Sequence, residues 1–473
     1  MTSGPAPTVL PRFVVAAPGS GHGKTTVATG IMAALVREGL DVTGFKVGPD
    51  YIDPGFHALA TGRPGRNLDP FLCGEDLVEP LLLHGARASG PTDVAVVEGV
   101  MGLFDGQIDG EGFASTAHVA ALTHTPVVLV VDVSHLSRTA GAIVHGLTTF
   151  EPGTQIGGVV LNKAASERHV REVRAAVEST GVPVLGVIPR DAGVEAPSRH
   201  LGLVPAEELD GSAALVAHLA QRVSDHVDLA AVLRIAHGAP ALTGVPWDPA
   251  AALGHPAVSG PRPVVAVAGG RAFTFRYAET EELLYAAGLA PVPFDPLRSP
   301  ALPDGAAGLY LGGGFPEVHA AELTGNAVLR GAVRAAVAAG LPTVAECAGL
   351  LYLCESVDGH PMVGAVAGRA AMGPSLTLGY RSAVAPAGSL LGPAGTRVTG
   401  HEFHRTTVAW ATAPAGAAWL LDGRSDGITL DPAGTGTPTV HASYLHTHWA
   451  GHPGLASRFA DAVHAFAERM ASP

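Results

Sequence analysis

A glycine-rich loop near the start of the sequence carries a lysine and two threonines at the spacing that binds phosphate. Residues 19–26 read Gly-Ser-Gly-His-Gly-Lys-Thr-Thr and follow the apolar run 13–17. In such a loop, at the start of a helix, backbone N–H groups cradle phosphates, the lysine neutralises their charge and the first threonine reaches Mg²⁺. Pro18 stands where the strict motif has its first glycine, so a glycine-rich turn with a chance lysine is the alternative. The order strand, loop, helix favours an ATP site, with the binding residues Gly21, Gly23, Lys24, Thr25 and Thr26.

Acidic side chains follow two of the predicted strands. Asp50 comes after the apolar run 42–46, and Glu98 ends the run 94–97. The carboxyl ends of parallel strands meet at the ligand-binding edge of a sheet, and carboxylates are ligands of Mg²⁺. Each of these acids alone is more often a turn former or a helix cap, but together they predict a metal site with the ligands Thr25, Asp50 and Glu98. Asn162, after the strand at 157–161, is in the position of a residue that contacts the base of the nucleotide.

A second set of reactive residues lies in the last third of the chain. Residues 343–350 read as strand, sharp turn and helix, with Cys347 at the turn. Such an elbow exposes a nucleophile, and the N–H of Ala348 is placed to stabilise an oxyanion. Gly313 and Gly314 are candidates for the second oxyanion donor, and His446 and His448 are candidates for the base that deprotonates the thiol. The alternative is a small buried cysteine and scattered histidines, of which the chain has 22; Cys354 is interpreted in that way, as core packing.

The elements that must position these residues alternate along the chain. Short apolar runs alternate with helical stretches up to about residue 235, which predicts a parallel sheet with helices on both faces. Residues 237–262 are crowded with Ala, Pro and Gly, and a second alternating series follows them. The sequence therefore predicts an ATP-binding domain at 1–236, a linker at 237–262 and a second α/β domain at 263–473, without an internal repeat.

Composition excludes several classes of protein. The net charge of −13 disfavours binding to nucleic acid. No apolar run approaches the roughly 18 residues that span a bilayer, and the start of the sequence lacks the pattern of a secretory signal. Three cysteines without a paired framework favour a reducing cytoplasm. Small molecules are the expected partners, and the sequence leaves a homodimer open.

Long motifs in both halves resemble one family of enzymes. Residues 48–57 read Gly-Pro-Asp-Tyr-Ile-Asp-Pro-Gly-Phe-His, and this motif and residues 97–106 are highly specific; residues 400–405 read Gly-His-Glu-Phe-His-Arg. These segments, with residues 65–69 and 345–349, look like the cobyrinic and hydrogenobyrinic acid a,c-diamide synthases over nearly the whole chain. The resemblance implies a P-loop domain similar to dethiobiotin synthetase, which activates carboxylates with MgATP. It also implies a class I glutamine amidotransferase domain with a flavodoxin-like sheet, which releases ammonia from glutamine. The products of this family are the a- and c-acetamides of a corrin ring, made on the way to vitamin B12.

The resemblance also implies roles for single residues. Cys347 would be the nucleophile and His446 its activating group, while Lys24, Thr25, Asp50 and Glu98 would lie at MgATP. Tyr51, Asp53 and Asp105 would shape substrate handling. Class I triads usually place a glutamate two residues after the histidine, where this chain has His448, so the residue that orients His446 is left open.

The acceptor is a polyanion, which predicts cationic and polar groups beside the phosphates. Arg66 is the foremost candidate, and ordinary surface ion pairs are the alternative. The other candidates are Arg63, Asn67, Arg190 and Arg199. Two other functions stay open at this point: an amidotransferase with another acceptor, such as a cobyric acid synthase or a cell-wall lipid amidotransferase, and a ParA-like ATPase switch. The sequence does not decide whether the corrin carries cobalt.

Overall fold

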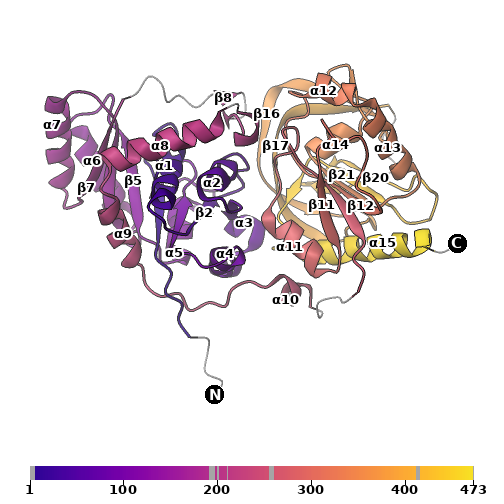
Figure 1. Ribbon diagram of the computed structural model, residues 1–473, viewed down its shortest axis with the longest axis horizontal. Coiled ribbons are helices and arrows are strands. Elements are labelled where there is room, and N and C mark those ends of the chain that lie inside the picture. Colours follow the sequence, from indigo (N-terminus) through magenta and orange to yellow (C-terminus); the bar gives the residue numbers. More distant parts are fainter. Residues whose placement is uncertain are drawn as a thin grey trace. The chain divides into compact units, whose positions relative to one another are not determined.

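The computed structural model describes residues 6–190, 198–199, 202–209, 211–254, 260–411 and 416–471. Two compact units follow one another along the chain, Met1–Trp247 and Asp248–Pro473 (Figure 1). The boundary falls inside the predicted linker, after Trp247, whose ring packs edge-on against His84 at a centroid distance of 5.0 Å. The domain limits predicted at 236/237 and 262/263 stay predictions. Across the described residues, no helix combines the length and apolar character needed to cross a membrane.

The first unit is built on a seven-stranded parallel sheet in the order β3-β2-β4-β1-β5-β6-β7. Its strands are β1 (Arg12–Ala16), β2 (Val42–Val47), β3 (Arg66–Leu68), β4 (Val94–Glu98), β5 (Val127–Asp132), β6 (Ile156–Ala164) and β7 (Val184–Pro189). Six of these seven strands overlap the apolar runs 13–17, 42–46, 94–97, 127–132, 157–161 and 184–188 of the sequence, and β3 lies outside them. A short pair, β8 (Ser198–Arg199) and β9 (Gly202–Leu203), follows.

Helices cover both faces of this sheet, as the alternation predicts. Successive residues of a strand point to opposite faces. A Cβ on Gly44 of β2 would meet Met32, whereas Phe45 contacts Gly85, so the helices that carry Met32 and Gly85 lie on different faces. The helices are α1 (Lys24–Arg37), α2 (Asp53–Thr61), α3 (Pro70–Cys73), α4 (Glu75–Ala88), α5 (Thr116–Leu122), α6 (Thr139–Phe150), α7 (Glu167–Glu178), η1 (Ala206–Glu208), α8 (Ser212–His226) and α9 (Leu229–His237).

The second unit contains two sheets. The first has the order β11-β10-β12-β13-β21-β20 and is parallel except at its β20 edge. Its strands are β10 (Val264–Ala268), β11 (Ala290–Phe294), β12 (Ala306–Leu311), β13 (Thr343–Glu346), β20 (Ile428–Leu430) and β21 (Val440–Ser443). The helices of the unit are α10 (Pro249–Leu253), α11 (Ala278–Ala286), α12 (Ala320–Gly325), α13 (Ala327–Ala338), α14 (Ala348–Leu353) and α15 (Gly454–Ala471).

The second sheet is centred on a long antiparallel pair that the sequence analysis did not predict. It contains β16 (Gly368–Val384), β17 (Arg397–Trp410), β14 (Ser356–Val357), β15 (His360–Pro361), β18 (Trp419–Leu421), β19 (Arg424–Asp426) and β22 (His446–Thr447). The chain leaves the first sheet at the end of β21 and joins the second at β22, only three residues later. This change of sheet places His446 on a different sheet from the strand that leads to Cys347.

Candidate active sites

The phosphate-binding loop has the backbone that its glycines predict. Helix α1 begins at Lys24, and Gly21 and Gly23 have φ angles of +82° and +89°, a region that L-residues rarely adopt. A Cβ on Gly23 would also lie 2.4 Å from Nδ2 of Asn162. That Nδ2 donates to the carbonyl of His22 at 2.9 Å, so Asn162 braces the loop from β6. Thr26 lies in the first turn of α1.

The side chain of Lys24 folds back over this loop. Its Nζ donates to the carbonyl of Gly19 at 3.0 Å and to the carbonyl of Met101. Burial, and next the charge of Lys46, lower the pKa of Lys24 to about 8. A phosphate would offer this ammonium a stronger partner than two carbonyls do.

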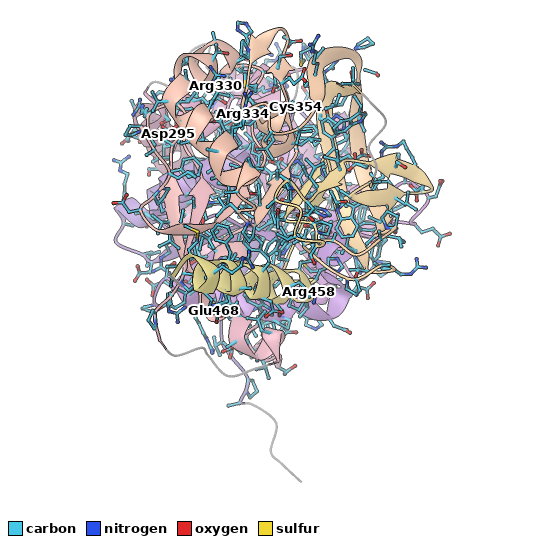
Figure 2. The ribbon with its side chains drawn as sticks, turned by 90° about the vertical axis from the view of Figure 1, so that its right-hand side faces the viewer. Asp295, Arg330, Arg334, Cys354, Arg458 and Glu468 are labelled. Atoms are coloured by element: carbon cyan, nitrogen blue, oxygen red, sulfur yellow. The ribbon has the colours of Figure 1, made fainter. Side chains whose placement is uncertain are left out.

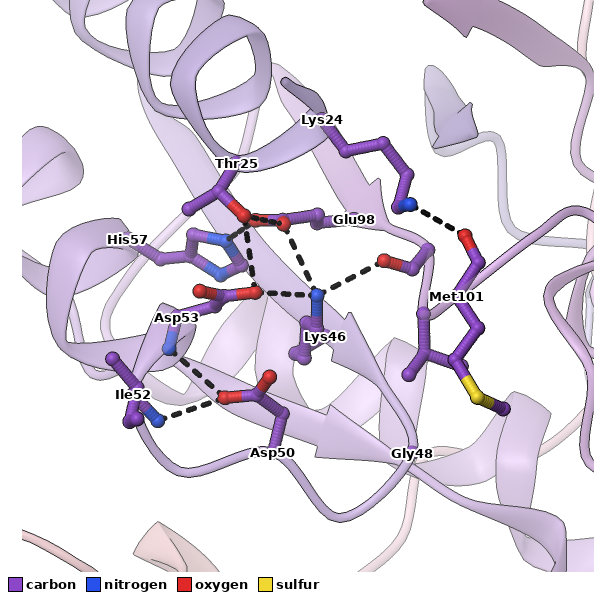
Figure 3. A network of polar contacts seen from close by, with 12 residues as sticks. Lys24, Thr25, Lys46, Gly48, Asp50, Ile52, Asp53, His57, Glu98 and Met101 are labelled. Atoms are coloured by element: carbon purple, nitrogen blue, oxygen red, sulfur yellow. Dashed lines mark hydrogen bonds and ion pairs between the residues drawn. The ribbon is translucent and has the colours of Figure 1, made fainter. Parts of the chain in front are cut away.

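Thr25 and two carboxylates form the centre of the site (Figure 3). The Thr25 hydroxyl donates to Oε1 of Glu98 at 2.6 Å and lies 3.2 Å from Oδ2 of Asp53. Asp50 has a different environment, because its Oδ1 accepts the backbone N–H groups of Ile52 and Asp53 at 2.8 and 3.1 Å. Asp50 thus fixes the start of α2, and Asp53 is the acid that this start brings to Thr25.

Two residues of this centre were missed by the sequence analysis. Nζ of Lys46 lies 2.5 Å from Asp53 Oδ2 and 3.0 Å from Glu98 Oε1. His57 Nε2 is 2.7 Å from Glu98 Oε2. Both side chains are buried, and a lysine at the end of an otherwise apolar buried strand is the signal that could have revealed Lys46.

The charges of this buried group depend on one another. Burial opposes the charge of Lys46, but Asp53 and Glu98 outweigh it and raise the pKa of Lys46. Burial, and next Asp50, raise the pKa of Asp53. The pKa of Glu98 is lowered, since Lys46 and His57 outweigh its burial. The result is a fixed negative charge on Glu98 between two positive or proton-donating groups.

The oxygens of Thr25, Asp53 and Glu98 suit Mg²⁺. This cation keeps several waters and takes one or two protein carboxylates together with substrate phosphates. Within the described ranges, no group of three or more His, Cys, Asp or Glu side chains could hold a metal by itself.

The remaining predicted residues of the first unit lie in varied settings. Asp105 is exposed, and its Oδ2 accepts the N–H of Gly102 at 2.9 Å. Tyr51 is buried, and Arg66 is 3% exposed with its Cδ against Gly85 of α4. The side chain of Arg199 lies outside the described residues.

Three other polar candidates also have defined places. Arg63 pairs with Asp41, just before β2, and so lies at the edge opposite the phosphate loop. Asn67 donates to the carbonyls of Gly48 and Asp50 at 2.8 and 2.7 Å and fixes that loop. Arg190 is exposed directly after β7.

In the second unit, Cys347 occupies the sharp turn between β13 and α14. Its φ and ψ are 47° and −97°, a strained backbone for a residue with a side chain. Its N–H donates to the carbonyl of Ser443 at 2.8 Å, and the N–H of Ala348 points at its sulfur. Burial, and next the charge of Glu317, raise the pKa of Cys347 far above its usual range. The thiol is therefore neutral in this structure.

The glycine loop after β12 brings Gly313 close to both Phe275 and His446. The N–H of Gly313 donates to the carbonyl of Phe275 at 3.0 Å and is thus already engaged. The predicted oxyanion donors Ala348 and Gly314 stay candidates, and the N–H of Ala348 is the one that bonds to the sulfur. A Cβ on Gly313 would lie 2.4 Å from Cε1 of His446, so this glycine admits the imidazole.

His446 and His448 face different surroundings. His446 is 1% exposed and pairs with His401 of β17; burial, and next His401, lower its pKa to about 3. His448 stacks on Tyr277 at a centroid distance of 4.0 Å, and its Nε2 lies 3.7 Å from Glu279 of α11. Only the former of these two imidazoles lies against the glycine loop that neighbours the Cys347 turn.

Cys354 has the structural setting that was expected of it. It is fully buried at the end of α14, and burial raises its pKa to about 12. Arg330 and Arg334, which are labelled with it in Figure 2, donate to the carbonyls of Met362 and Val363 at 2.9 and 2.6 Å. The N–H of Gly364 also donates to the carbonyl of Cys354 at 2.7 Å. Together these three bonds hold the segment after α14 in place.

Comparison with known proteins decides the family. The model of the CobQ/CobB/MinD/ParA nucleotide binding domain matches residues 13–204, and that of the CobB/CobQ-like glutamine amidotransferase domain matches residues 264–454. The hydrogenobyrinate a,c-diamide synthase of Thermobifida fusca is 62% identical over 98% of this chain and 98% of its own length. The chain belongs to the a,c-diamide synthase family. The predicted fold class, family and class of reaction, a glutamine-hydrolysing ligase, are thereby confirmed.

Other members of the a,c-diamide synthase family match almost as completely. The hydrogenobyrinate a,c-diamide synthase of Streptomyces coelicolor is 53% identical over 98% of this chain and 99% of its own length. The cobyrinate a,c-diamide synthase of a Synechococcus species is 41% identical over 95% and 98%. The rival reading as a ParA-like switch does not account for the glutamine amidotransferase domain.

Proposed function

We propose that this a,c-diamide synthase converts the a and c acetate side chains of hydrogenobyrinic acid into carboxamides, with ATP and glutamine, in cobalamin biosynthesis. The observation that carries the choice of acceptor is the 62% identity to a hydrogenobyrinate a,c-diamide synthase. The relatives named for cobyrinate are more distant, at 41% and 36%. The small number of cysteines, three in the whole chain, fits a reducing cytoplasm, and a homodimer stays a prediction.

In the first unit, the proposed reaction activates a carboxylate. The loop N–H groups and Lys24 hold the phosphates of ATP, and Thr25, Asp53 and Glu98 would hold Mg²⁺. When bound, that cation neutralises charge that builds up on the β- and γ-phosphates. An acetate oxygen of the acceptor attacks the γ-phosphorus, the bond to ADP breaks, and an acyl phosphate forms.

Lys46 supports this step from below the phosphate loop. It is held between Asp53 and Glu98, so it keeps both carboxylates in place and balances their charge. Tyr51, Asp105 and Arg66 are kept as candidates for acceptor handling. The burial of Arg66 argues against direct contact with the acceptor.

In the second unit, the proposed reaction releases ammonia. The sulfur of Cys347 attacks the amide carbon of glutamine while its proton passes to His446, a neutral imidazole and hence a competent acceptor. The N–H of Ala348 stabilises the oxyanion. His446 returns the proton to the leaving nitrogen, ammonia departs, and water hydrolyses the γ-glutamyl thioester. Ammonia then attacks the acyl carbon of the acyl phosphate, phosphate leaves, and the nitrogen loses a proton to give the amide.

The test is a comparison of acceptors. Purified protein is incubated with ATP, Mg²⁺, glutamine and either hydrogenobyrinic or cobyrinic acid, and the mono- and diamides are separated by chromatography. We expect the diamide of hydrogenobyrinic acid at the higher kcat/KM. A preference for cobyrinic acid would overturn the choice of acceptor, and glutamine hydrolysis without amidation of either acid would overturn the reaction itself.

A further inference from the structure

A buried hydrogen-bond network joins the residue before Cys347 to the residue after His446. Oε1 of Glu346 accepts the Thr447 hydroxyl at 2.7 Å and the Thr447 N–H at 3.3 Å. Its Oε2 accepts the Tyr310 hydroxyl at 3.0 Å. Trp449 donates its indole N–H to the Thr447 hydroxyl oxygen at 3.1 Å. All four side chains are buried.

This network connects two sheets that backbone hydrogen bonding does not join at this point. Cys347 follows a strand of the first sheet, whereas His446 lies in β22 of the second sheet. Register within either sheet does not fix the distance between these two residues, because no ladder joins β13 to β22. Glu346 bonds directly across that gap, one residue from each reactive group.

We propose that Glu346, acting through Thr447, is the positioning residue that holds His446 at the thiol of Cys347. It does so in place of the acid that class I triads use two residues after the histidine, a position occupied here by His448, which faces Tyr277 and Glu279. The inference rests on the proposed roles of Cys347 and His446. Glu346 touches neither substrate nor reacting atoms, so its effect passes through the backbone of β22.

The surroundings of Glu346 suit a carboxyl group that accepts hydrogen bonds and does not need a negative charge. Its partners are two hydroxyls and the Thr447 N–H, and the Trp449 indole N–H donates to one of those hydroxyls; no lysine or arginine bonds to it among the described residues. Burial, offset in part by the bonds from Thr447 and Tyr310, raises its pKa to about 7. The nearest titratable groups that face it are the Tyr310 hydroxyl and the neighbouring Cys347 thiol. A neutral amide of the same shape should serve nearly as well.

The test breaks the link at Thr447, which leaves the Glu346 side chain beside Cys347 in place. Thr447→Val keeps the shape and removes the hydroxyl, and we expect glutaminase kcat to fall about 10- to 100-fold through misplacement of His446. KM for glutamine and ammonia-dependent amidation should change little. The single variants Thr447→Ser and Glu346→Gln should each retain most of the parent's glutaminase kcat, because both keep a hydrogen bond between positions 346 and 447.

Two comparisons separate positioning from a structural role. Thr439→Val removes another buried hydroxyl of the same unit, one that makes no hydrogen bond within the described part of the chain, and should leave glutaminase kcat unchanged. In a His446→Ala background, Thr447→Val should have no further effect on kcat, since groups that act as one unit are not additive.

The results that overturn the proposal are a Thr447→Val kcat within twofold of the parent, or full additivity with His446→Ala. If instead His446→Ala or Cys347→Ala retained glutaminase activity, the proposed function of those residues would fail, whatever Thr447→Val did.

Discussion

Cys347 and His446 carry opposite pKa shifts that share one cause. Burial raises the pKa of the thiol and lowers that of the imidazole to about 3, so both groups are neutral at pH 7. Many reactive cysteines instead exist as thiolates stabilised by a neighbouring cation. Here the proton must leave the sulfur during the attack, because the thiol is neutral beforehand.

This neutral state predicts how Cys347 reacts with iodoacetamide. Only the thiolate is alkylated, and its fraction rises tenfold per pH unit below the pKa. We expect the logarithm of the alkylation rate to rise with a slope near one from pH 6 to pH 9, measured by mass spectrometry of the Cys347 peptide. Glu317→Gln should speed the reaction at every pH, because it removes a charge that raises the thiol pKa. An alkylation rate that no longer changes with pH below pH 7 would show a preformed thiolate and contradict the interpretation that the thiol is neutral.

At the same scale, sequence motifs indicate candidate reactive residues more readily than the residues that contact and support them. Lys24, Thr25, Glu98 and Cys347 stand in motifs whose local geometry carries the chemistry. Lys46, His57 and Glu346 contact partners 7 to 101 residues away in the sequence, so these contacts are visible only in the fold. The sequence predicts Asp50 as a metal ligand and Asp53 as a residue that handles substrate. In the structure Asp53 lies near Thr25, whereas Asp50 accepts the N–H groups of Ile52 and Asp53.

Among the elements, periodicity identified the parallel strands but not the second sheet. Buried strands such as β5 are continuous apolar runs, which sequence alone identifies. The long pair β16–β17 alternates irregularly and has a break in register between Met372 and Thr377, so it carries no clear period. The short strand β22 is defined only by its partner β17, and two residues cannot show a period.

Strand β21 contains a histidine that limits stability in acid. His441 is fully buried edge-on to Trp419 at 5.0 Å, neither ring nitrogen has a hydrogen-bond partner among the described residues, and burial lowers its pKa to about 3. The unfolded chain binds this proton near pH 6.5 and the folded chain does not. Stability is therefore intact above pH 6.5 and falls as the pH drops below it, by on the order of 2 kcal/mol at pH 5.

The measurement is urea unfolding of the parent and of His441→Phe at pH 8 and pH 5. The phenylalanine variant should lose less stability between the two values, because it has no proton to bind. His360→Asn, at an exposed position of β15, is the matched control and should follow the parent. Equal losses in the parent and in His441→Phe would mean that His441 does not set this dependence.

At the scale of the whole molecule, each unit builds one site at the carboxyl ends of its own parallel strands. Thr25, Asp53 and Glu98 meet beside β2 and β4, and Cys347 and the glycine loop follow β13 and β12. The two half-reactions therefore use separate residues, which the sequence already indicated by two motif sets on either side of a linker. The chain order of the two domains could be predicted for this reason, whereas the exact limits between them stay predictions.

Because the two sites are separate, we expect variants of one site to lose only glutamine-dependent amidation and variants of the other to lose amidation with glutamine and with ammonia. Cys347→Ala should abolish glutamine-dependent amidation yet keep amidation with concentrated ammonium chloride, because free ammonia replaces the product of the second unit. Lys24→Ala and Glu98→Gln should lose amidation with either source, by about 10²- to 10³-fold for a lost charge contact. The variants are compared by amide yield at saturating ATP, with glutamine hydrolysis measured in parallel to verify that the second unit of Lys24→Ala is intact. A folded Cys347→Ala protein that fails with both nitrogen sources would mean that Cys347 also supports the first unit, and the assignment of one reaction to each unit would have to be abandoned.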